Sequence, residues 1–269
     1  MRLALTGASG IIGGFVLRAS LAAGHQVTRL DRSSGFTLGD APDLSGHDAL
    51  IHCAFAHAPG RYRGGEGDDP QGFLRLNRDG TLRLFDAAIR DRVPRIVFLS
   101  SRAVHDGHPA GMVLADDLLA RPTNLYGRIK AETEACLTGL PVAGTSLRAT
   151  GVYGPGPANK WRGILDDYRA GRPVAPRVAT EVHGDDLAQA ILLLLDQPAP
   201  PSHVNCSDLV LDRHDLLAEV AALTGCPHPL PDRADPSSLR IQTCHRLRDL
   251  GWRPGGMARL RATLPHLLC

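Results

Sequence analysis

The sequence has few aromatic residues, only two lysines and no concentration of one charge. Phe, Trp and Tyr make up 4% of the 269 residues, and the formal net charge of +2 comes from charges scattered along the chain. Nucleic-acid-binding surfaces usually combine a basic stripe with exposed aromatic side chains on which bases stack. The composition therefore argues against a nucleic-acid partner.

Long apolar runs and paired cysteine motifs are also missing. The longest largely apolar run, residues 188–195, is too short to cross a bilayer, and MRLALTGASG enters a predicted strand and turn too early for a signal peptide. The six cysteines form no CxxC pair, which favours free thiols in a reducing compartment, and the twelve histidines show no zinc-ligand spacing. We therefore expect a cytoplasmic protein without a membrane partner or a metal site.

Short apolar runs alternate with segments of helical spacing over the first 150 residues. We predict strands at residues 2–5, 26–30, 36–38, 49–53, 95–100 and 143–147, and helices at 11–23, 80–90 and 126–137. This alternation is typical of an α/β fold with a doubly wound parallel sheet of the Rossmann type. After residue 150 proline and glycine become more frequent. We predict a dinucleotide-binding domain at 1–150 and a smaller substrate-binding lobe at 151–269, with a segment near 180–206 returning to the first domain.

Three glycines, Gly7, Gly10 and Gly13, form a GxxGxxG motif between the first predicted strand and helix. The first permits a tight turn, the second lets the backbone approach a pyrophosphate at the helix N-terminus, and the third lets helix and strand pack closely. Asp31 ends the second strand, where an acid binds the adenosine ribose and repels a 2′-phosphate. We predict NAD as the cofactor, and the adjacent Arg32 keeps NADP as the alternative.

Tyr126 and Lys130 stand four residues apart in the run NLYGRIK, 25 residues after the Ser-Ser pair that ends a predicted strand. Residues at this spacing share one helix face, and a nearby ammonium favours the phenolate of a tyrosine whose pKa is otherwise near 10. The phenol can then exchange a proton with an alcohol or ketone near neutral pH. Ser101 would hydrogen-bond the same substrate oxygen, and Lys130 can also reach the nicotinamide ribose. Together with the glycine turn, these residues predict a hydride-transfer site.

With these motifs, the chain resembles the extended short-chain dehydrogenase/reductase superfamily, in its NAD-dependent epimerase/dehydratase branch. The matching segments are TGASGIIG (6–13), IHCAF (51–55), NRDGT (77–81), FLSSRAVHD (98–106), YGRIK (126–130), LRATGVYGPG (147–156), VHGDDLAQA (182–190) and LGWRP (250–254). They extend over nearly the whole chain. They are specific for the superfamily and say little about the substrate.

The resemblance also implies roles for single residues. Catalysis falls to Ser101, Tyr126 and Lys130. The residues implied to line the cofactor, beyond the three glycines, Asp31, Arg32, Tyr126 and Lys130, are Ile11, Ile12, Ala54, Phe55 and Val152. Asp40 is either an adenine contact or a turn residue, and Asp186 is expected to cap a later helix.

Several positions depart from the family pattern. Arg102 and Ala103 stand where sugar-nucleotide 4,6-dehydratases carry an Asp-Glu pair, which argues against that dehydration. Gly151 stands where many nucleotide-sugar enzymes have an asparagine that holds the sugar diphosphate, and Thr180 lies near the place of a frequent arginine. These departures weaken the hypothesis of a UDP- or dTDP-sugar substrate without excluding it.

Two classes of function stay open. The first is hydride transfer at a secondary alcohol or ketone of a sugar or sugar-nucleotide-like small molecule, by an epimerase or by a simple NAD(P)-dependent dehydrogenase or reductase. The second is a non-catalytic NAD-binding protein, against which the intact catalytic set argues. Specificity is predicted to lie in loops 59–70 and 154–176. By resemblance, the helices at 80–90 and 126–137 imply a homodimer.

Overall fold

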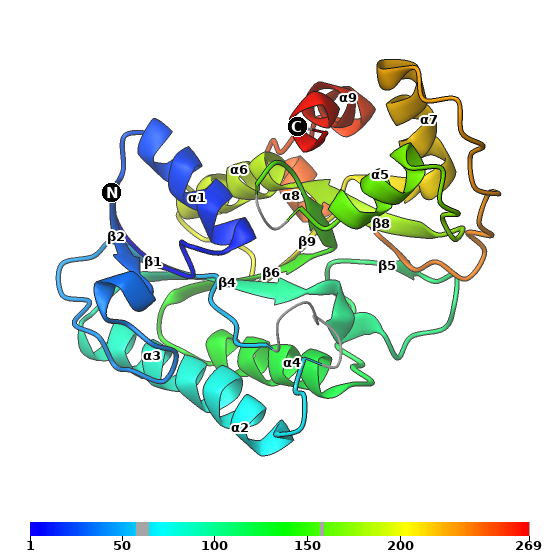
Figure 1. The fold of residues 1–269 in the computed structure, drawn as a ribbon. Helices are drawn as coiled ribbons and strands as arrows, with labels where there is room; N and C mark the ends of the chain where they lie inside the picture. Colours follow the sequence, from blue (N-terminus) through cyan, green and yellow to red (C-terminus); the bar gives the residue numbers. More distant parts are fainter. Residues whose placement is uncertain (58–64, 157–158, 269) are drawn as a thin grey trace.

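A parallel six-stranded sheet forms the centre of the protein (Figure 1). The computed structural model describes residues 1–57, 65–156 and 159–268. The strand order is β2-β1-β3-β4-β6-β9, and every neighbouring pair is parallel. The strands are β1 (Arg2–Thr6), β2 (Gln26–Leu30), β3 (Ala49–His52), β4 (Arg95–Ser101), β6 (Ala143–Ala149) and β9 (His203–Cys206). This is the predicted doubly wound Rossmann-type sheet.

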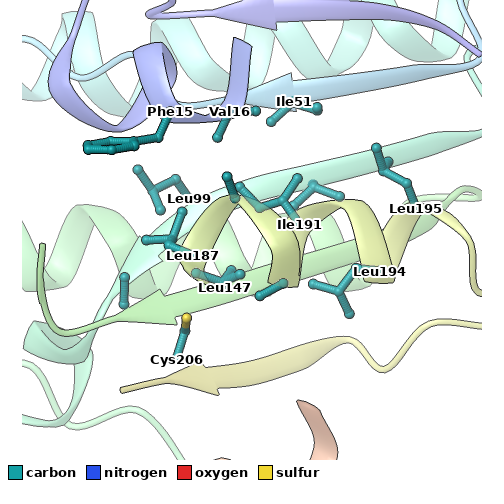
Figure 2. Close-up of a cluster of buried hydrophobic side chains, with 14 of the residues drawn as sticks. Phe15, Val16, Ile51, Leu99, Leu147, Leu187, Ile191, Leu194, Leu195 and Cys206 are labelled. Carbon is teal, nitrogen blue, oxygen red and sulfur yellow. The ribbon is translucent and has the colours of Figure 1, made fainter. Parts of the chain in front are cut away.

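Helices cover both faces of this sheet. On one face, α1 (Ile11–Ala22) and α6 (Gly184–Leu195) pack side chains such as Val16 and Ile191 against Ile51, Leu99 and Leu147 of the strands (Figure 2). On the other face lie α3 (Gly80–Arg90) and α4 (Leu125–Thr138). Each fully buried aliphatic side chain contributes about 1.5–3 kcal/mol of transfer free energy, so these two layers form the main core.

The helix α3 continues directly from a shorter helix. α2 (Pro70–Leu74) runs into a π-helical turn, Arg75–Asp79, which leads into α3. The Asn77 carbonyl in this turn accepts the hydroxyl of Thr81 from α3 at 2.6 Å, while the Asn77 side chain binds the backbone of Ala56. The widened turn thus presents the buried Asn77 amide to the chain that follows β3.

A smaller C-terminal lobe is built on a three-stranded sheet of order β10-β8-β7. Its strands are β7 (Gly151–Tyr153), β8 (Val178–His183) and β10 (Leu209–Asp212), and its helices are α5 (Arg162–Arg169), α7 (Arg213–Thr224) and α9 (Gly256–Leu267). A short helix α8 (His245–Asp249) and a two-stranded pair, β5 (Val113–Leu114) with β11 (Ile241–Gln242), complete the fold. This lobe has its own hydrophobic core, which includes Tyr153, Trp161, Tyr168 and Leu260.

Two local predictions are wrong. Residues 36–38 form no strand, because Asp31 caps a 3-10 turn at Arg32–Ser34 and Phe36 places its side chain in the core instead of pairing in the sheet. Asp186 does not cap α6. His183 is the N-cap, and its Nδ1 accepts the N–H of Asp185.

The boundary at residue 150 stays a prediction, although β9 and α6 come from after that residue and belong to the central layers. No helix in the described part of the chain is long and apolar enough to span a bilayer.

Candidate functional site

The glycine turn joins β1 to α1 and lies against the end of β3. Gly7 has a φ of +71°, and a Cβ there would come within 2.8 Å of the Ala54 backbone nitrogen. Gly13 packs on the Gly7 carbonyl, where a side chain has no room. Gly10 is the N-cap of α1, which has no side-chain cap, and Ile11 and Ile12 form its first turn. Uncapped N–H groups at a helix N-terminus suit a pyrophosphate, so the turn fits a dinucleotide.

Hydrogen bonds hold the end of β3 in position beside this turn. The Thr6 hydroxyl donates to Nδ1 of His52 at 2.6 Å and accepts the N–H groups of Cys53 and Ala54. Nε2 of His52 lies 2.9 Å from the Thr81 hydroxyl. Burial and the nearby ammonium of Lys130 lower the pKa of His52 to about 3. His52 is therefore a neutral core histidine that orders the strand end from which Ala54 and Phe55 project.

Asp31 ends β2 with its carboxylate already well bound. Its oxygens accept hydrogen bonds from the backbone and hydroxyl of Ser33, from the Ser34 backbone and from the Arg29 guanidinium. These bonds lower the pKa of Asp31 to about 2, with Ser33 the largest cause. The carboxylate is therefore charged at any working pH and would repel a 2′-phosphate.

The other two residues predicted near the adenosine differ in their surroundings. Arg32 is exposed in the turn after Asp31. Asp40 accepts the backbone N–H and hydroxyl of Thr37, at 2.7 and 3.0 Å, as a turn residue does. This favours the turn alternative for Asp40.

Tyr126 and Lys130 lie on one face of α4 and meet Phe55. The ring of Phe55 packs edge-on against Tyr126, with 5.0 Å between centroids, and lies 4.4 Å from the Lys130 ammonium. The same ammonium is 4.6 Å from the Phe98 ring and 5.9 Å from the Tyr126 ring. The structure thus brings together the predicted phenol, the predicted cation and one of the residues predicted to line the cofactor.

Lys130 is almost inaccessible to water. It is 3% exposed, and its Nζ donates to the Leu99 carbonyl at 2.7 Å. Burial lowers the pKa of Lys130 to about 7, against weaker opposing effects of Cys53 and Glu134. An ammonium held this way still has two N–H donors for other partners. Such perturbed groups are typical of functional sites.

Ser101 and the start of α4 both contact the turn that follows β4. The Ser101 hydroxyl caps this turn by accepting the Ala103 N–H at 3.2 Å, and a Cβ on Gly127 would come within 2.7 Å of the Ala103 carbonyl. Gly127 therefore lets the start of α4 pack directly on the turn. The preceding Ser100 points elsewhere, because its buried hydroxyl donates to Glu134.

Sequence reasoning missed the buried support behind this face of α4. Glu134 binds the Arg148 guanidinium through two hydrogen bonds of 3.1 Å and one of 2.7 Å, and both side chains are at most 4% exposed. Glu134 lies one helical turn after Lys130, so the same spacing of four that identified Lys130 could have pointed to it. Nothing in the sequence around Arg148 on β6 indicates that it pairs with Glu134.

Val152 lies in β7, one residue after Gly151, and is partly buried. Residues 59–64 of the loop predicted at 59–70, and residues 157–158 of the loop at 154–176, lie outside the described residues. Among the residues that are described, no group of three or more His, Cys, Asp or Glu side chains could hold a metal ion.

The model of the NAD dependent epimerase/dehydratase family matches residues 3–207 of this sequence. The chain belongs to this family. The match covers the glycine turn, the Ser101 strand, the Tyr126 helix and the return of the chain through β9. The predicted family and the prediction of a NAD-dependent enzyme are confirmed.

Curated relatives agree with this assignment. A UDP-glucose 4-epimerase of Corynebacterium glutamicum is 27% identical over 94% of this chain and 91% of its own. A dTDP-glucose 4,6-dehydratase of Streptomyces niveus is 31% identical, over 58% of this chain and 55% of its own.

Solved structures share the fold over the whole chain. The UDP-glucose 4-epimerase of Thermotoga maritima, with UDP-glucose, matches with a TM-score of 0.80 at 20% identity and covers 99% of this chain and 98% of that one. The UDP-glucose 4-epimerase of Thermus thermophilus, in complex with NAD, matches with a TM-score of 0.77 at 24% identity and covers 99% of each chain. At these identities the likeness concerns the fold.

Proposed function

We propose that this protein uses NAD to transfer a hydride at a secondary alcohol or ketone carbon of a sugar or sugar-nucleotide-like substrate, with Tyr126 as the acid/base. The observation that carries the proposal is the buried ammonium of Lys130 beside Tyr126 and Phe55. A cation is costly to bury, and here it lies next to a phenol whose deprotonation it would favour.

In this proposal each residue has one task. NAD supplies the acceptor for the hydride. Tyr126 takes the alcohol proton or returns it to the ketone, and Lys130 stabilises the phenolate by its charge. Ser101, at the end of β4, donates a hydrogen bond to the substrate oxygen and so orients the reacting carbon.

The glycine turn supports the choice of a dinucleotide. Gly7 and Gly13 leave no room for side chains, and the N-terminus of α1 has no side-chain cap. The charged Asp31 supports NAD over NADP. Relatives named as UDP-glucose 4-epimerases support a sugar-nucleotide substrate and an epimerase.

The test compares wild type with Tyr126→Phe on UDP-glucose, UDP-galactose, D-glucose and D-glucuronate in the presence of NAD. Turnover should fall by about 10²–10⁴ in the variant, the usual effect of removing a general acid/base. The matched control is Tyr168→Phe, because the Tyr168 hydroxyl binds the His228 carbonyl in the C-terminal lobe. Full activity of Tyr126→Phe would exclude the proposed role.

The same assay separates the alternatives. An epimerase interconverts the two UDP-sugars without net NADH, whereas a dehydrogenase accumulates the absorbance of reduced nicotinamide. Stabilisation by NAD without turnover of any of the four compounds would instead favour a non-catalytic NAD-binding protein.

We also propose a homodimer through α3 and α4. The exposed residues of these helices include Arg83, Asp86, Arg128 and Glu132, so that such an interface would be polar, with both charges available to pair across a two-fold axis. Sedimentation velocity measures the assembly state. The cytoplasmic location stays a prediction from the sequence.

A further inference from the structure

A largely buried ion pair, Lys160 with Glu181, lies beside Gly151 in the C-terminal lobe. The ammonium of Lys160 donates to Oε2 of Glu181, and the two side chains are 24% and 8% exposed. Gly151 is the register partner of Glu181 across β7 and β8. A Cβ on Gly151 would come within 2.6 Å of both charged atoms. The pair therefore fills the space that a side chain at position 151 would occupy.

The strand register brings this pair close to the proposed catalytic site. Ser101 is paired with Ala149 across β4 and β6, and Gly151 follows Ala149 by two residues. Two extended residues span at most about 7 Å. Val152, one of the residues predicted to line the cofactor, is the next residue in the chain. The pair thus lies at the carboxyl end of the parallel strands, where ligands bind in open α/β sheets.

Stability alone does not account for the pair. Burial raises the pKa of Glu181 and lowers the pKa of Lys160, although each charge opposes the effect on the other. A buried ion pair can often be replaced by apolar side chains without loss of stability. Other ion pairs of this lobe, such as Arg261 with Glu219, have one or both side chains well exposed. The Lys160–Glu181 pair is more buried than these three and resembles the pair of Arg259 with Asp186, and it keeps part of Lys160 exposed.

We propose that Lys160 and Glu181 form a subsite for two neighbouring hydroxyl groups of the substrate's sugar ring. This inference rests on the proposed function. After its bond to Glu181 the ammonium has two N–H donors left, and the carboxylate keeps free lone pairs. One ring hydroxyl accepts from Lys160 and the next donates to Glu181, which is the arrangement a vicinal diol offers. The subsite selects a polyhydroxylated ring and does not require a nucleotide.

The decisive experiment uses calorimetry to measure how tightly NAD-saturated protein binds three sugar probes, UDP-glucose, D-glucose and D-glucuronate. UDP, which carries no sugar ring of this kind beyond its nucleoside, is the control ligand. The variants are Lys160→Met and the double variant Lys160→Met/Glu181→Gln. The double variant removes both charges at similar volume, so that it stays folded even where the single variant leaves Glu181 unpaired. Arg261→Met, which breaks the Arg261–Glu219 pair, is the matched control.

For each sugar probe that wild type binds, the affinity of the double variant should be at least tenfold lower than that of wild type. Its affinity for NAD and any affinity for UDP should stay unchanged. A purely structural role would lower NAD affinity together with sugar affinity. Sugar affinity within twofold of wild type would overturn the subsite and leave the proposed function intact. If NAD-loaded wild type binds none of the three sugars, the proposed function fails and the subsite with it.

Discussion

A charged side chain at Lys130 is held almost wholly out of water by three aromatic rings and one carbonyl group. Phe55, Phe98 and Tyr126 surround its ammonium, and Leu99 accepts its hydrogen bond. These contacts only partly replace hydration, so the pKa falls from 10.5 to about 7. Burying the charged form of Lys130 therefore lowers the free energy of unfolding. Functional sites often retain such a loss of stability.

Replacing Lys130 with Met should stabilise the protein and abolish turnover. An unfolded lysine keeps its proton up to about pH 10.4, whereas the folded one loses it near pH 7. The penalty is therefore complete below pH 7 and disappears as the pH rises toward 10.4. We expect Lys130→Met to raise the free energy of unfolding by about 1–2 kcal/mol at pH 7.

Urea denaturation at pH 7 and pH 9.5 measures this effect. Wild type should gain stability between the two pH values relative to Lys130→Met. Arg128→Met, on the exposed side of the same helix, serves as the control and should follow wild type. A Lys130→Met protein that is less stable than wild type at pH 7 would contradict the burial argument.

Asp31 should decide between the two nicotinamide dinucleotides. Its carboxylate, with a pKa of about 2, is a permanent negative charge at the end of β2. In Asp31→Asn we expect NADH binding to weaken about tenfold, or 1.4 kcal/mol, and NADPH binding to improve, because an acceptor is lost and the repulsion disappears. Fluorescence titration with both cofactors measures the change. Asp40→Asn should leave both affinities unchanged, and an equal effect of the two variants would refute this role of Asp31.

At the scale of the element, α4 carries the candidate site on a single face. Tyr126, Lys130 and Glu134 follow one another at intervals of four, and the helix begins where the Asn124 side chain accepts the Gly127 N–H at 2.8 Å. Glu134 binds Arg148 of β6 and the Ser100 hydroxyl of β4. The helix is therefore tied to two strands by a buried polar group, which fixes its rotation and with it the direction of Tyr126.

Glu134→Gln should destabilise the protein by about 3–5 kcal/mol, because it leaves the Arg148 guanidinium buried without a counter-charge. Glu219→Gln removes one partner of the Arg261 pair, whose arginine is 61% exposed, and should cost less than about 1 kcal/mol. Chemical denaturation of both variants tests the contrast. Equal losses would mean that burial does not distinguish the two pairs.

At the scale of the whole molecule, the chain leaves the central sheet for the C-terminal lobe and then returns. β7 and β8 belong to the small sheet, yet α6 and β9 complete the large one. Figure 2 shows Leu187 and Ile191 of α6 against the strand residues Leu99 and Leu147. Because this helix covers one face, the two halves of the chain share a core.

A fragment of residues 1–150 should therefore fail to fold independently. Without α6 and β9 it exposes the apolar face formed by Ile51, Leu99 and Leu147 and leaves β6 as an edge strand. We expect binding of a hydrophobic dye, no cooperative thermal transition and no measurable NAD affinity, with the full chain as the reference. A cooperative transition together with NAD binding by the fragment would support the boundary at residue 150 as a true domain limit.

The features that could be predicted from the sequence depend on residues that lie close together along the chain. The glycine spacing required a tight turn, alternating apolar runs required a layered α/β fold, and an interval of four put Tyr126 and Lys130 on one face. Residues 36–38 show the limit of prediction from sequence, because their short apolar run has the same pattern as a strand. Only the structure shows that Asp31 caps a turn just before them, so that they do not join the sheet. The catalytic and cofactor roles of the site residues stay predictions.

By itself, the sequence determined the family and the parallel sheet and predicted which residues carry a hydride transfer, because periodicity and turn chemistry act between residues close in the chain. Only the tertiary structure decided that Phe55 lies against Lys130, that Glu134 binds Arg148 and that Lys160 and Glu181 fill the space beside Gly151. These partners lie 14 to 75 residues apart. Their meeting depends on strand register and helix rotation, which are set when the layers pack.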